Sequence, residues 1–202
     1  MVKITKMSHK ISYSEKISYR DTVLRDFLVY LYCMKAKILK NSHNLIDSSE
    51  LTNYILAKGG SMNHLKLQKV LYYVEAWHLV FFNKSIVEDE FQAWVHGPVS
   101  KKLWNEVKNL SVLYSELEVS KPEKIIKDVE EKLNQDQIDL INDVIKKYGK
   151  QSGYNLECLT HNELPWIEAR EGLSPNAPSN NIISKKTMKK YYSELLHRYT
   201  KK

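Results

Sequence analysis

The sequence predicts a mainly α-helical protein, in which a compact helical domain with a small β-hairpin or short strand element follows an N-terminal helical extension. Only 6 Gly and 5 Pro occur among 202 residues, so few positions break regular structure. Apolar side chains recur at helix spacing in several long segments, and 43% of the residues are hydrophobic, which is enough to bury a core. We place the extension, a basic arm plus a helix, at residues 1–44 and the domain at residues 45–202.

The extension begins with a polar segment, residues 1–18, which lacks a sustained period and is expected to form an arm. Residues 21–40 are predicted to be helical, because five apolar side chains fall on one face: Val23, Leu24, Phe27, Leu28 and Leu31. A short extension could hardly bury this stripe alone. We therefore predict that Phe27, Leu28 and Leu31 contact a partner.

The strongest helix signal covers residues 64–82, where apolar positions follow i, i+3 and i+4 spacing. Lys66, Lys69 and Glu75 lie on the opposite face and are expected to be polar surface. This helix is long and apolar enough to be the centre of the domain.

The other elements follow from alternation and from breakers. Residues 91–95 alternate apolar and polar side chains, which predicts a short strand. Gly97 and Pro98 should end it, and the proline should start a helix through Val107. The remaining pattern predicts a helix over 48–58, an extended piece near 113–119, helices over 123–133, 136–148 and from 153 to before Pro165, one turn over 166–170, a loop over 172–181 and a last helix over 185–199.

The formal charge of +7 lies at the two ends of the chain. Residues 1–45 carry +6, residues 46–183 carry −5 and residues 184–202 carry +6. An acidic body with basic ends fits a protein-binding module with basic arms at least as well as it fits a DNA-binding surface. Two cysteines, no apolar segment near the roughly 20 residues of a membrane span, and no signal-peptide pattern predict a cytoplasmic protein that does not contact a membrane.

No motif for catalysis, metal binding or a cofactor appears, so we predict a protein that is not an enzyme and uses no metal or cofactor. Two arrangements imitate chemistry. His161 and Glu163 could hold a metal together with His96, and Cys158 with His161 could form a thiol nucleophile beside its base. A capping histidine and a packed cysteine are the commoner explanations.

Aromatic residues outside the buried stripe are candidates for partner contacts, because Tyr and Trp anchor protein interfaces. Tyr73 and Trp94 are such residues. A row of lysines on the last predicted helix could follow phosphates, although a hydrated face is the commoner role. Nucleic acid is therefore a secondary candidate for the binding partner. A second copy of the chain is another. The row consists of Lys185, Lys186, Lys189 and Lys190.

Three segments occur in a recognisable order: LKLQKVLYYVEAWHL at 65–79, FQAWVHGPVSKKLW at 91–104 and THNELPW at 160–166. Together they resemble the Panacea antitoxin domain family, also called SocA-like or GepA-type phage-associated proteins, and the resemblance extends over residues 45–199. Tyr148, Gly149 and residues 152–159 fill a further family segment. The residues that match the family motifs are Leu67, Gln68, Lys69, Tyr72, Trp94, Gly97, Pro98, Val99, His161, Glu163, Pro165 and Trp166.

The resemblance implies a mostly helical domain that binds and neutralises a cognate toxin. Some members resemble proteolytic adaptors that hand the toxin to an ATP-dependent protease. From the residues alone, the motifs indicate a scaffold: Gln68 and Lys69 form a polar edge, Gly97 permits an abrupt turn and Trp166 packs inward. Our first hypothesis is an antitoxin that binds its toxin directly, and the alternatives are a proteolytic adaptor and a DNA-binding regulator of its own operon.

Overall fold

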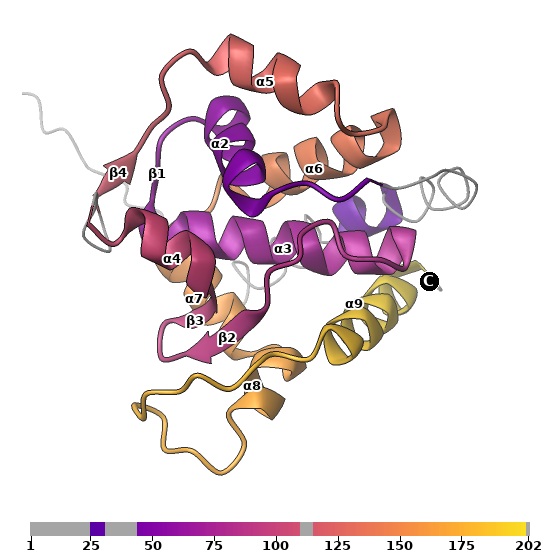
Figure 1. Ribbon diagram of the computed structural model, residues 1–202. Helices are drawn as coiled ribbons and strands as arrows, with labels where there is room; N and C mark the ends of the chain where they lie inside the picture. The colour runs from indigo at the N-terminus through magenta and orange to yellow at the C-terminus, as the bar shows by residue number, and fades with distance from the viewer. Residues whose placement is uncertain (1–24, 31–43, 110–114, 201–202) are drawn as a thin grey trace, which may run out of the picture.

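The computed structural model describes residues 25–30, 44–109 and 115–200, and in these residues the chain is mainly α-helical with short strands, as predicted (Figure 1). No helix within these ranges combines the length and the apolar character that crossing a bilayer requires. The predicted arm at 1–18 and most of the predicted helix at 21–40 lie outside the described residues. Residues 25–30 are helical.

Helix α3 (His64–Phe82) is the centre of the fold, as the sequence predicts. In Figure 1 it runs through the middle of the molecule, with α2 (Ser48–Gly59), α5 (Pro122–Glu130) and α6 (Gln135–Tyr148) on one side. On the other side lie α7 (Gly153–His161), α8 (Leu164–Ala169) and α9 (Lys185–Thr200). Because neighbours surround it, α3 has no solvated face, and the expected polar surface is wrong for Lys69 and Glu75, which are fully buried.

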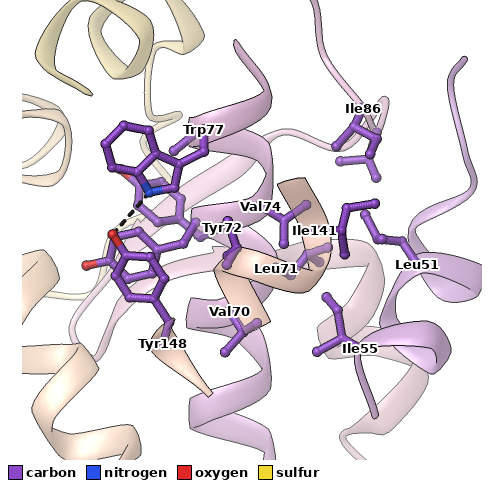
Figure 2. Packing of buried hydrophobic residues seen from close by; sticks show 14 of the residues in the cluster. Leu51, Ile55, Val70, Leu71, Tyr72, Val74, Trp77, Ile86, Ile141 and Tyr148 are labelled. Carbon is purple, nitrogen blue, oxygen red and sulfur yellow. Dashed lines mark hydrogen bonds between the residues drawn. The ribbon is translucent and has the colours of Figure 1, made fainter. Parts of the chain in front are cut away.

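The buried hydrophobic residues form one core cluster, and Figure 2 shows two groups of side chains within it. In one group Leu51 and Ile55 of α2 approach Ile141 of α6, and all three side chains are fully buried. In the other group aromatic rings gather around Trp77 and Tyr148. Each fully buried aliphatic or aromatic side chain contributes about 1.5–3 kcal/mol to folding.

The helix ends follow their local sequence signals. Asp47 caps α2 by accepting a hydrogen bond from Ser49 N, and Gly60, with φ 76°, ends it. Asn134 and Gln137 form a capping box at α6, and Ser152 caps α7. The predicted helix over 123–133 is shorter than expected, because α5 ends at Glu130.

The segment after the first strand is a hairpin, and the prediction that Pro98 starts a helix is wrong. Strand β2 (Phe91–Trp94) pairs antiparallel with β3 (Gly97–Ser100), and Pro98 lies opposite Ala93. The Ala93 N–H bonds outward to Asn181 O, so the missing N–H of the proline leaves no ladder hydrogen bond unmade. Helix α4 (Lys101–Val107) therefore begins three residues after the proline.

A second pair of short strands joins the start of α3 to the later chain. Strand β1 (Met62–Asn63) pairs with β4 (Glu116–Leu117), which lies in the piece predicted to be extended near 113–119. Residues 113 and 114 lie outside the described residues.

Candidate functional site

The motif segments meet where the first half of α3 contacts the hairpin. Gln68 joins them, because its Oε1 accepts a hydrogen bond from Ser100 N at 2.8 Å and its Nε2 donates to Ser100 O at 3.3 Å. Ser100 also caps α4, since its Oγ accepts from Leu103 N at 3.1 Å. Gln68 is 2% exposed, so it is a buried clamp between α3 and the hairpin rather than part of a polar edge.

Lys69 lies beside this clamp and is fully buried. Its Nζ donates a hydrogen bond to Pro98 O at 3.1 Å. Burial lowers the pKa of Lys69 from 10.5 to about 7, against the smaller opposing attraction of Glu157. The expectation of a solvated lysine fails because the hairpin covers this face of α3.

Gly97 allows the hairpin to approach α3 this closely. Its φ of 92° belongs to the region that favours glycine. A Cβ at this position would lie 2.6 Å from Lys69 Cε and 2.8 Å from Thr160 Oγ1. The glycine of the motif is therefore required both by its backbone conformation and by its neighbours.

We expect Gly97→Ala to lower the free energy of unfolding by about 2–4 kcal/mol, since backbone strain and overpacking each cost about 1–3 kcal/mol. Gly172→Ala is the matched control, because Gly172 has φ 79° but a Cβ added there would meet nothing within 4 Å. It should lose only about 1 kcal/mol. Urea denaturation of both variants measures the difference, and equal losses would contradict a role for the close approach.

Glu163 is the centre of a buried polar cluster between α3 and α9. Its Oε2 accepts a hydrogen bond from Tyr192 OH at 2.6 Å, and Tyr73 OH donates to both carboxylate oxygens at 3.2 Å. Burial raises the pKa of Glu163 from 4.5 to about 8, although both tyrosine hydrogen bonds act in the opposite direction. The carboxyl group is therefore mostly protonated at neutral pH.

Tyr73 was expected to contact a partner, and the structure corrects this expectation. Its side chain is fully buried, and its ring stacks on Tyr148 with centroids 3.9 Å apart. Tyr148 OH in turn accepts a hydrogen bond from Trp77 Nε1 at 3.0 Å, as Figure 2 shows. Tyr73 fails to fit the apolar stripe because its hydroxyl group has a buried partner in Glu163, not because it faces solvent.

Trp94 and Trp166 join the hairpin to α8. Trp166 Nε1 donates to Trp94 O at 3.0 Å, and the Trp166 ring stacks on His161 at 4.1 Å. The Trp94 ring is partly exposed and packs against Trp104, with centroids 5.4 Å apart. Lys101 Nζ lies 4.1 Å from the Trp104 ring centroid and 5.1 Å from that of Trp94. Trp94 thus stays a candidate for partner contact.

The predicted partner-seeking stripe of the N-terminal helix packs on its own chain where it is described. Leu28 is fully buried, and the Phe27 ring lies 6.0 Å from the rings of both Trp77 and Tyr148. Leu31 lies outside the described residues. Phe27 and Leu28 are therefore core contacts, which corrects their assignment to a partner.

We expect Leu28→Ala to lower the free energy of unfolding by about 2–4 kcal/mol, because truncating a buried leucine leaves a cavity. Val29→Ala is the control, since Val29 is 40% exposed and should lose less than about 0.5 kcal/mol. Guanidinium denaturation compares the two variants. Similar small losses would mean that residues 25–30 do not stabilise the domain.

The row of lysines on α9 is partly used inside the chain. Lys185 Nζ lies 3.0 Å from Glu75 Oε1 and donates to Ser85 Oγ and Val87 O, also at 3.0 Å. Lys189 Nζ donates to Asn83 Oδ1. Lys186 and Lys190 are not part of these contacts, so the row is not a uniform cationic face.

In the described part of the chain, the candidate metal site and the candidate thiol–imidazole pair do not form a reactive centre. No group of three His, Cys, Asp or Glu side chains there could hold a metal ion. His96 Nδ1 is hydrogen-bonded to Glu157 Oε1 at 3.0 Å, while Glu163 faces Tyr73 and Tyr192. Cys158 is partly exposed, and its backbone carbonyl accepts from Asn162 Nδ2.

Residues 67–167 match the protein family described as antitoxin SocA-like, Panacea domain. The chain belongs to this family. The match covers half of the chain, runs from α3 to α8 and contains every motif residue discussed above. No curated protein and no solved structure matches the chain. The Panacea family is an antitoxin family, whose members in general have a toxin as partner and are generally not enzymes.

The arrangement explains what most of the Panacea motif residues do in this chain. Gln68, Lys69 and Gly97 fix the hairpin on α3, and Glu163 fixes the α7–α8 junction on α3 and α9. Trp94 and Trp166 are motif aromatics that are partly exposed, and Trp94 is the one on the hairpin. These residues thus support the hairpin and its surroundings from the interior.

Proposed function

We propose that this protein is an antitoxin that acts in the cytoplasm and neutralises a cognate protein toxin by direct binding. The observation that carries the proposal is the family match over residues 67–167. The buried positions of Lys69, Glu163 and Tyr73 support it, because these polar residues are used to build a scaffold. Trp94, as a partly exposed aromatic residue on that scaffold, is the proposed toxin contact.

We also propose that residues 1–44 form an extension to a domain at 45–202 and help to select the toxin. This region lies outside the matched residues and carries much of the positive charge. Deleting it would also remove Leu28 from the core, so a deletion alone does not test selectivity. Charge reversal at Lys3, Lys6 and Lys10 keeps Leu28 and is the better variant.

Co-expression with the product of a neighbouring gene that arrests growth tests the proposal. The unchanged protein should restore growth and copurify with the toxin, and Trp94→Ala should weaken both. Tyr154→Ala is a control, because Tyr154 is an exposed aromatic residue on α7, 68% accessible. Absence of rescue and of a complex would contradict the antitoxin proposal.

The same cells distinguish masking of the toxin from its delivery to an ATP-dependent protease. Direct masking predicts an unchanged or longer toxin half-life in the presence of the antitoxin, whereas an adaptor shortens it. The alternative function, DNA binding as a regulator of its own operon, requires cationic side chains that are free to contact phosphates. Lys185 and Lys189 of α9 instead contact Glu75 and Asn83. A mobility shift that persists at high salt would favour specific DNA readout.

A further inference from the structure

A pocket of about 430 Å³ lies among α3, the hairpin, α4 and the loop at 178–180. This volume is in the range of roughly 300–1,000 Å³ that holds small molecules. Trp94 and Trp104 line the pocket and contact each other at an interplanar angle of 62°. They give it flat aromatic surfaces.

The loop that borders the pocket is held in place by a buried arginine. Arg170 is 6% exposed, and its guanidinium donates to Ala93 O at 2.9 Å and to Ala177 O at 2.8 Å. It also donates to Ser174 O and Pro175 O. The pocket is therefore largely formed before any ligand arrives, which lowers the entropic cost of binding.

Two lysines line the pocket. Lys69 is fully buried, while the exposed Lys101 lies beside the two tryptophan rings. His64 and His96 also line it, and none of the described residues that line it is acidic. An ammonium group has three donors, and among the described residues Lys69 Nζ donates to one acceptor, Pro98 O.

We propose that this pocket binds a small aromatic carboxylate, with its ring against Trp94 and Trp104 and its carboxylate directed to Lys69. Lys101 is the second cation that lines the pocket. Ligand binding at this pocket is separate from toxin neutralisation and is tested without a toxin. The apolar walls select the ring and the two lysines select the negative charge.

Binding of the carboxylate should be linked to protonation of Lys69. The charged and titratable groups that act on this lysine are Glu157 and His161 of α7 and His64 of α3, and Lys101 of α4 lines the same pocket. A carboxylate bound at Nζ favours the protonated form. Without ligand, the pKa of Lys69 is about 7. Above neutral pH, ligand binding should therefore be accompanied by uptake of a proton, and the affinity should fall as the pH rises.

Isothermal titration calorimetry with indole-3-acetate and its uncharged analogue indole-3-acetamide tests the proposal. The unchanged protein should bind the acid at least about tenfold more tightly than the amide, because the acid adds a charge-assisted hydrogen bond that the amide lacks. Lys69→Met should remove this preference and the proton uptake. Lys108→Met is the control, since Lys108 Nζ lies 4.7 Å from the Trp104 ring outside the pocket lining.

Equal affinity for acid and amide would overturn the proposal, as would a preference for the acid that survives Lys69→Met, or no binding of either probe at millimolar concentration. Rescue from the toxin is measured separately, so failure here leaves the antitoxin proposal standing. A short peptide with a C-terminal tryptophan carboxylate is the last probe. Tighter binding of that peptide than of indole-3-acetate assigns the carboxylate to a protein chain end, and weaker binding assigns it to a free small molecule.

Discussion

Glu163→Gln is expected to remove most of a pH-dependent loss of stability between about pH 5 and pH 8. The unchanged protein should lose roughly 3–4 kcal/mol of unfolding free energy over this window through this one residue, because the loss approaches about 1.4 kcal/mol per pH unit between the two pKa values. The variant should be about as stable as the unchanged protein at pH 5 and more stable at pH 8. Urea denaturation at a series of pH values measures the effect.

The sign follows from the direction of the pKa shift of Glu163. The ordinary pKa of a glutamate side chain, which applies in the unfolded chain, is 4.5, and the pKa of Glu163 in the folded protein is about 8. Below pH 4.5 the group is protonated in both states and costs nothing. As the pH rises, the unfolded chain releases its proton first, so the folded state loses stability until it too ionises near pH 8.

Two further variants make this prediction specific. Glu131→Gln changes a carboxylate whose side chain is 66% exposed and should leave the pH profile unchanged. Tyr192→Phe removes a hydrogen bond that lowers the pKa of Glu163, so it should extend the loss of stability to higher pH. A Glu163→Gln profile that runs parallel to that of the unchanged protein would refute the assignment.

Lys69→Met is expected to raise the unfolding free energy by roughly 3 kcal/mol at pH 7 and to have little effect at pH 10. The buried lysine has a folded pKa of about 7 against an ordinary value of 10.5. Its cost is therefore present below pH 7 and disappears as the pH rises towards 10.5. The lost hydrogen bond to Pro98 O offsets about 1 kcal/mol of the gain.

The matched variant for this test is Lys66→Met, because Lys66 is on the same helix but is partly exposed. It should change stability by less than about 0.5 kcal/mol at either pH. If Lys69→Met were destabilising at pH 7 by more than the lost hydrogen bond explains, the lysine would not be a cost to the fold. Stabilisation would also ensure that the variant is folded for the ligand titrations.

Together the two residues predict a stability profile with a minimum. Glu163 lowers stability as the pH rises from 4.5 to 8, and Lys69 raises it as the pH rises from 7 to 10.5. The minimum should lie between about pH 7 and pH 8. Each variant removes one side of the profile, and other groups such as Lys147 cancel when a variant is compared with the unchanged protein at the same pH.

The sequence by itself determined the elements whose signals are local. The periodicity of residues 64–82 predicted α3, and the predicted helices over 48–58 and from 153 correspond to α2 and α7. The order of the three motifs was enough to predict the family. These features depend on residues close in the chain, so propensity and spacing suffice.

Tertiary structure alone decided which polar residues are buried. A helical period assigns Lys69 and Glu75 to one face, but it cannot tell that the hairpin and Lys185 of α9 cover that face. All residues of α3 except Lys66 and Phe82 are buried. A helix that is apolar enough to be enclosed on all sides indicates that its few polar residues have buried partners.

The same reason explains Pro98, Tyr73 and Leu28. The role of each residue was predicted from its own segment, but contacts with distant residues decide its position. Asn181 bonds to the hairpin beside Pro98, Glu163 bonds to Tyr73, and the core encloses Leu28. A buried charge or hydroxyl group destabilises the fold unless another part of the chain supplies a hydrogen-bond partner. The sequence therefore determined the helices and the family, and long-range packing decided that the motif residues form the interior support of the hairpin.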